Sequence, residues 1–177
     1  MSGLEDRVFD AIVQRVAART YVDDMPASRL PVLEPASAAA VAQAEELAGR
    51  GLPPLLRRLY LEVGDGGFGP GYGLFGLDKA TRGIAGGFLN LCDWGCGITS
   101  ELDLRDGQVW GSDPNPAPDD VEWSFPQGMT IVEWFAKWVD GRLHQPWLLQ
   151  DPESGLWRGA TDEETAAMLE EAFGPAD

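Results

Sequence analysis

A glycine-rich run is the first place where this sequence could bind a ligand. Seven glycines fall between Leu52 and Leu77, in the stretch LPPLLRRLYLEVGDGGFGPGYGLFGL, and runs of this kind can cradle phosphate groups. A P-loop needs Gly-Lys followed by Ser or Thr at the start of a helix, and the run contains no such triplet. A dinucleotide fingerprint needs a strand before the glycines, whereas a helical pattern precedes them here. The sequence therefore predicts turn and bulge glycines and no phosphate site.

Thiols and imidazole offer little more chemistry. Cys92 and Cys96 lie four residues apart, and a zinc site would need two further ligands, which the single His144 does not complete. The spacing differs from Cys-x-x-Cys, so a redox pair is the weaker alternative and we expect two reduced thiols in the core. One histidine leaves little scope for an activated nucleophile, and Gly-x-Ser-x-Gly is absent. We predict no catalytic residue, no metal and no cofactor.

Carboxylates are the most abundant reactive groups, since 29 acids against 13 bases give a formal net charge of −16. At this density the proximity of two acids says nothing about glycoside hydrolysis. The excess is uneven, because residues 63–177 hold 20 acids and 6 bases, a net charge of −14. Such a surface repels nucleic acid and anionic membranes and speeds association with a basic partner. The alternative is that the charge serves solubility alone.

Helical periodicity and capping signals predict five helices that would position these groups. Capping boxes, in which a Ser or Thr precedes a Glu by three residues, mark the start of the first, fourth and fifth helices. A proline opens the third helix, where its missing N–H costs nothing. The helices are expected at residues 4–19, 37–48, 53–63, 131–140 and 161–173.

Alternating apolar and polar residues predict short strands in the second half of the chain. They are expected at 88–91, 97–104, 108–111, 147–150 and 156–159, with a further strand after the glycine turn at 65–67. The Pro-rich acidic segment 112–120 is expected to be a loop. This order predicts an α+β fold, a single domain with a mostly antiparallel sheet packed by helices on one side.

Length and hydropathy are consistent with one globular unit. A chain of 177 residues with 44% apolar content suits a single domain over residues 1–177. No apolar run approaches the 18 or so residues of a membrane span, and the N-terminus is charged, so we expect a cytoplasmic protein.

Three segments together resemble the SUKH superfamily, the Smi-Knr type proteins of fungal cell-wall regulation and bacterial immunity. They are AAVAQAEELAGRGLPPLLRRLYLEVGDGGFGPGYGLFGL, FLNLCDWGCGITSELDLRDGQVW and TIVEWFAKWVDGRL. The resemblance covers about residues 37–143, with the helix at 4–19 and the hairpin plus helix at 147–173 as extensions. Asp65 stands where the family usually has Asn. The residues that match the family pattern are interpreted as fold positions: Gly66, Gly67, Trp94, Gly95 and Gly97.

The resemblance implies a non-enzymatic binding domain, often an immunity protein that holds a cognate toxin inactive. A nuclease toxin carries basic surface, which an acidic inhibitor can occupy. The alternative is a housekeeping or regulatory scaffold that binds an endogenous partner, and a small-molecule enzyme would require a deep pocket lined by convergent polar groups. An exposed tryptophan, Trp110 or Trp123, is a candidate anchor. The candidate acidic contacts are Asp65, Asp103, Asp106, Asp113, Asp119, Asp120 and Glu122.

Overall fold

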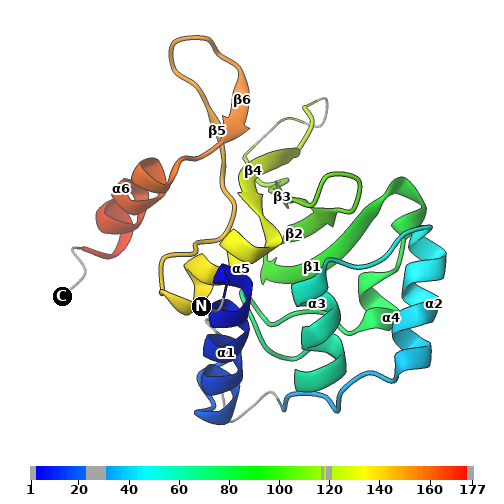
Figure 1. Cartoon of the computed structure of the whole chain (residues 1–177). Coiled ribbons are helices and arrows are strands. Elements are labelled where there is room, and N and C mark those ends of the chain that lie inside the picture. Colours follow the sequence, from blue (N-terminus) through cyan, green and yellow to red (C-terminus); the bar gives the residue numbers. More distant parts are fainter. Residues whose placement is uncertain (1–2, 23–30, 117, 119–120, 175–177) are drawn as a thin grey trace.

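Four strands form one antiparallel sheet with the spatial order β1-β2-β3-β4 (Figure 1). The computed structural model describes residues 3–22, 31–116, 118 and 121–174. Neighbouring strands in the sheet are also neighbours in the sequence, so the sheet is a meander. Its strands are β1 (Phe88–Gly95), β2 (Ile98–Asp103), β3 (Gln108–Ser112) and β4 (Ser124–Thr130).

Helices pack against one face of this sheet, and the structure confirms a single α+β domain. Thr130 begins α5 with the expected capping box, and Thr161 begins α6 in the same way. The N-cap residue of the first helix is Gly3, and the box predicted at its start depends on Ser2, which lies outside the described residues. The helices are α1 (Leu4–Ala17), α2 (Ala38–Ala48), α3 (Pro54–Arg58), which continues as the π-helical turn η1 (Leu59–Val63), α4 (Leu77–Ala80), the 3-10 turn η2 (Ile84–Gly86), α5 (Ile131–Val139) and α6 (Asp162–Phe173).

The core lies between one face of the sheet and the helices. Trp134 and Trp138 of α5 are fully buried, as their i, i+4 spacing predicts, and Phe135 packs edge-on to both rings. Helix α1 closes the core beside α5, where Arg15 lies 4.3 Å from the Trp138 ring and its guanidinium donates to the Trp138 carbonyl at 2.7 Å. The buried residues of α1 are Val8, Phe9 and Ile12.

The glycine-rich run forms a loop that folds back on itself. Five glycines between residues 66 and 73 have positive φ, and the Leu74 amide donates to the Phe68 carbonyl. A strand needs negative φ at each residue, so the predicted strand after the turn is wrong. At Gly66, with φ +89°, a Cβ would lie 2.5 Å from the Leu74 carbonyl oxygen, so the loop needs glycine there for both dihedral and space.

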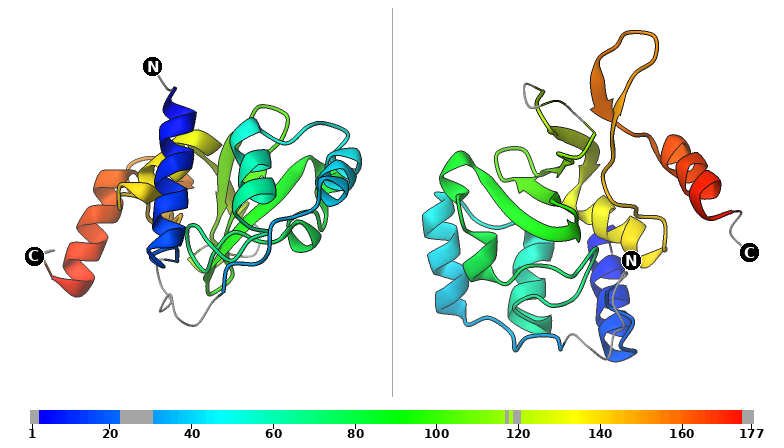
Figure 2. Two further views of the ribbon diagram at one scale, coloured as in Figure 1. Left: turned by 60° about the horizontal axis from the view of Figure 1, so that its bottom comes forward. Right: turned by 180° about the vertical axis from the view of Figure 1, so that it is seen from behind.

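The C-terminal arm, residues 143–174, docks through a hairpin and then projects from the domain. The hairpin consists of β5 (Leu148–Gln150) and β6 (Trp157–Gly159), as the sequence predicts. Two glycines permit the docking, because a Cβ on Gly111 would collide with Pro146 and a Cβ on Gly159 would collide with the Phe125 ring. Both views of Figure 2 show α6 standing apart from the sheet. Within the ranges described above, no helix combines the length and apolar character needed to cross a membrane.

Candidate functional site

The sheet face turned away from the core carries aromatic and polar residues around one acid, Glu101. Register places Asn90, Glu101, Trp110 and Pro126 in one row across the four strands, and Phe88 contacts Trp110 edge-on with ring centroids 5.6 Å apart. These five residues, here called the open face, are half-buried or exposed, whereas their strand neighbours Leu89, Leu102 and Val109 are buried. Alternation along each strand produces this division. The open face is therefore accessible to a partner.

Glu101 occupies the middle of the open face, and the Arg105 guanidinium lies over the neighbouring Phe88 ring, 5.2 Å from its centroid. No ion pair or hydrogen bond joins its carboxylate to the described parts of the chain. Partial burial beside Trp110 and Asn90 raises the pKa of Glu101 above its ordinary value, because desolvation disfavours the charged form. A cationic side chain placed on this face would relieve that cost.

Glu101→Gln is expected to stabilise the free protein at neutral pH. Because the pKa of Glu101 is higher in the folded state, the free energy of unfolding falls as the pH rises from the ordinary Glu range through the raised pKa. Removing the charge recovers this part of the free energy of unfolding. The gain amounts to about 0.5 kcal/mol once solvent screening of a half-exposed group is allowed for. Urea unfolding at neutral pH and at about pH 4 tests this, since the gain should shrink at the lower pH. A less stable variant at neutral pH would contradict it.

Two of the predicted contact acids are buried and bonded within the chain. The Asp103 carboxylate accepts from the Arg105 guanidinium at 2.6 and 2.8 Å, and these hydrogen bonds hold the pKa of Asp103 below its usual range. Asp113 is 1% exposed and accepts from the backbone amide of Leu148, at 3.1 Å, and from the backbone and side-chain amides of Asn115. The prediction that Asp103 and Asp113 contact a partner is corrected, because both carboxylates are already occupied inside the fold.

Of the other predicted contact residues, one is bonded within the fold and several are exposed at the surface. Asp65 is half-buried, and its carboxylate accepts from the Leu77 amide at 2.8 Å at the start of α4, so we assign it to the loop and not to a partner. Asp106 and Glu122 are exposed, and Trp123 has 42% of its surface accessible. Trp110 is half-buried on the open face. Asp119 and Asp120 lie outside the described residues.

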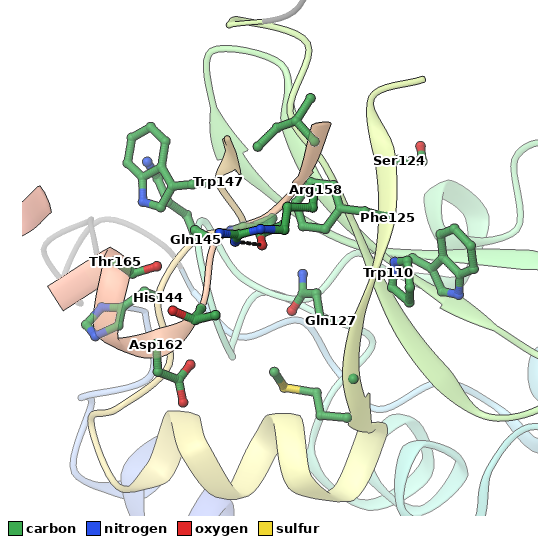
Figure 3. A pocket seen from close by; sticks show the side chains of 18 of the residues that line it. Trp110, Ser124, Phe125, Gln127, His144, Gln145, Trp147, Arg158, Asp162 and Thr165 are labelled. Atoms are coloured by element: carbon green, nitrogen blue, oxygen red, sulfur yellow. Dashed lines mark hydrogen bonds between the residues drawn. The ribbon is translucent and has the colours of Figure 1, made fainter. Parts of the chain in front are cut away.

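A cavity of about 760 Å³ lies where the edge strand β4 meets the C-terminal arm (Figure 3). It adjoins the open face, because Trp110 and Pro126 belong to both. A bulge shapes this edge, since Gln108 pairs with Thr130 and Trp110 pairs with Pro126, which leaves three residues of β4 opposite one of β3. Gln127, the first residue of the bulge, is directed into the cavity (Figure 3). His144 is half-buried in the cavity wall.

Both bases that line the cavity are paired with acids. Lys137 of α5 contacts Asp162 at 2.7 Å, and Arg158 of β6 makes two hydrogen bonds to Glu164, at 2.7 and 2.8 Å. Hydrogen bonds from Arg158 and from the Thr161 amide lower the pKa of Glu164 to about 2. These pairs leave Glu122, which has no such partner among the residues described, as the unneutralised charge of the wall.

The prediction of two reduced core thiols has a mixed outcome. Cys92 and Cys96 are not joined by a disulfide. Cys92 is buried as expected, but Cys96 is exposed, because it lies in the β1–β2 turn with φ +53°. Within the described ranges, no group of three or more His, Cys, Asp or Glu side chains is placed to hold a metal ion.

Sequence reasoning missed Glu101 and Gln127. The signal for Glu101 was its alternation with Leu102, which places it on the wet face of β2, although 29 acids gave no reason to single it out. Gln127 had no signal, because Pro126 and Gly128 flank it and made β4 resemble a loop. Comparison of the chain with protein-family models gave no match, and neither did comparison with curated proteins. The function is therefore argued from the geometry of this chain.

Proposed function

We propose that this protein is a non-enzymatic protein-binding domain that holds a basic partner against its open face. The observation that carries the proposal is Glu101, a desolvated and unpaired carboxylate set between Trp110 and Asn90. A Lys or Arg of a partner would pair with this carboxylate and pack on the Trp110 ring, a combination that interface anchors commonly use. Asp106 and Glu122 add negative charge among the exposed residues.

The net charge of −16 supports a basic partner, because a field of this sign steers cations toward the surface. The C-terminal arm contributes seven acids against Arg158, a net charge of −6. Taken with the SUKH-like order of the segments, this favours an immunity protein that neutralises a basic toxin such as a nuclease. A regulatory scaffold with an endogenous basic partner would use the same face, and a neighbouring gene for a large secreted toxin would distinguish the two.

Glu101→Gln is expected to weaken binding of the partner about tenfold, the cost of one charge-assisted contact at an interface. The partner would be isolated on the immobilised protein, identified by mass spectrometry and purified, and its association would be followed by surface plasmon resonance. Glu46→Gln is the matched control, since it removes the same charge from an exposed position on α2. Association should also slow as salt rises, because the Debye length falls from about 10 Å at 0.1 M to about 3 Å at 1 M.

Equal affinities of Glu101→Gln and Glu46→Gln for the partner would show that Glu101 does not contact it. An association rate that does not change with salt would exclude electrostatic steering. Turnover of a small molecule by the pure protein, abolished by a cavity variant, would replace the binding proposal with an enzymatic one.

A further inference from the structure

Three buried nitrogen donors around the cavity have no hydrogen-bond acceptor in the described parts of the chain. They are Trp110 Nε1 of β3, Gln127 Nε2 of β4 and Trp147 Nε1 of the connector between α5 and β5. A fourth such donor, Trp134 Nε1, belongs to the core and does not line the cavity. Native proteins leave few buried donors unpaired, because each one costs free energy. Three unpaired donors at one cavity indicate a site for a ligand that supplies hydrogen-bond acceptors.

The connector lies against one of these donors, the Gln127 amide. A Cβ placed on Gly111 would lie 2.8 Å from Gln127 Nε2 and would also collide with Pro146, so the Gln127 amide is held between β3 and the connector. All three nitrogens are shielded by neighbouring atoms, so an acceptor reaches them only when those neighbours shift. Binding here therefore requires a small opening between the C-terminal arm and the sheet.

We propose that the cavity binds an extended, proline-rich segment of the partner that carries lysine. The inference rests on the proposed function and adds a second contact to the open face. A polyproline II chain makes no hydrogen bonds of its own, so its carbonyl oxygens are free to accept from Trp and Gln N–H groups. Proline rings pack on aromatic walls, and four aromatic residues line this cavity: Trp110, Phe125, Trp147 and Trp157.

Charge at the cavity selects lysine over an acid in that segment. The wall bases Lys137 and Arg158 are already paired with carboxylates, whereas Glu122 is exposed and unpaired within the described chain. A lysine of the bound segment would meet the Glu122 carboxylate, and an acid would be repelled there. The cavity and the open face would then both recognise positive charge.

A blocked synthetic peptide of repeated Pro-Pro-Lys units tests the proposal on the full-length protein. Binding would be followed by tryptophan fluorescence, with a Gly-Gly-Lys peptide and a Pro-Pro-Glu peptide of equal length as controls. We expect saturable binding of the Pro-Pro-Lys peptide and at least about tenfold weaker binding of both controls, the cost of one lost hydrogen bond or charge contact. No binding of the Pro-Pro-Lys peptide would overturn the proposal. Equal binding of the Gly-Gly-Lys peptide would show attraction by charge alone and would overturn it too.

Gln127→Met separates a binding role from a structural one. It removes an unpaired donor at similar volume, so the melting temperature of the free protein should rise by a few degrees while peptide binding weakens about tenfold. Gln43→Met, at an exposed position on α2, should change neither property. A Gln127→Met protein that binds the peptide as the unmodified protein does would overturn the proposal.

Glu101→Gln and Gln127→Met together distinguish failure of the cavity proposal from failure of the proposed function. If the purified partner binds more weakly to Glu101→Gln but equally well to Gln127→Met, the open face binds the partner and the cavity does not.

Discussion

Gly66→Ala is expected to destabilise the fold by about 3 kcal/mol or more, the range seen when backbone strain and a steric collision act together. Gly66 has φ +89°, and a Cβ there would lie 2.5 Å from the Leu74 carbonyl oxygen and 2.6 Å from the Gly76 amide nitrogen. Both obstacles are backbone atoms, so no rotation of a side chain can relieve them. Urea unfolding followed by tryptophan fluorescence measures the loss.

Gly107→Ala provides the control for the Gly66 experiment. Gly107 lies in the β2–β3 turn with φ +76°, and a Cβ there would meet no atom within 4 Å. Only the dihedral cost remains, about 1 to 2 kcal/mol. Equal losses in the two variants would show that the glycine-rich loop is not tightly packed at Gly66.

Asp113→Ala is expected to cost about 3 kcal/mol and to loosen the C-terminal arm. The Asp113 carboxylate accepts from the amide of Leu148, 35 residues away, and it also accepts from two groups of Asn115. Its removal leaves the buried Leu148 amide unpaired, and a buried unpaired donor costs about 1 to 3 kcal/mol. Hydrogen exchange should therefore become faster at Leu148 and along β5, and urea unfolding should move to lower denaturant.

Asp106→Ala is the matched variant for Asp113, because Asp106 is exposed and accepts from the Gln108 amide in a turn. A change of about 0.5 kcal/mol is expected, as for other exposed turn residues. If Asp113→Ala leaves the exchange of the Leu148 amide unchanged, the arm is held by its apolar contacts and not by this carboxylate.

Predictions from local signals succeeded where a few adjacent residues decide the outcome. The capping boxes at Thr130 and Thr161 placed the starts of α5 and α6, and the apolar spacing of α5 identified its buried face. Strand β4 was missed because Pro126 and Gly128 read as turn residues. Proline is tolerated in β4 because this strand lies at the edge of the sheet and is bulged, and both conditions depend on strand order, which no local pattern encodes.

The candidate site was predicted less well than the fold, for an electrostatic reason. Sequence shows how many carboxylates a chain has, but it does not show which of them the fold has already paired. Asp113 is used to hold the arm, Asp103 holds Arg105, and Glu101 is left without a cation. The accessible acids are those that remain after tertiary pairing, so identifying them required the structure.

The unequal exposure of the two cysteines makes the protein easy to probe. Cys96 is exposed in the β1–β2 turn, whereas Cys92 is buried within β1. A maleimide dye should react at Cys96 and spare Cys92, since thiol alkylation requires access of the reagent. One fluorophore could thus be attached without engineering a new cysteine, at a position outside the open face and the cavity. Its energy transfer to a second dye on a peptide or partner would report how far from the turn each of them binds.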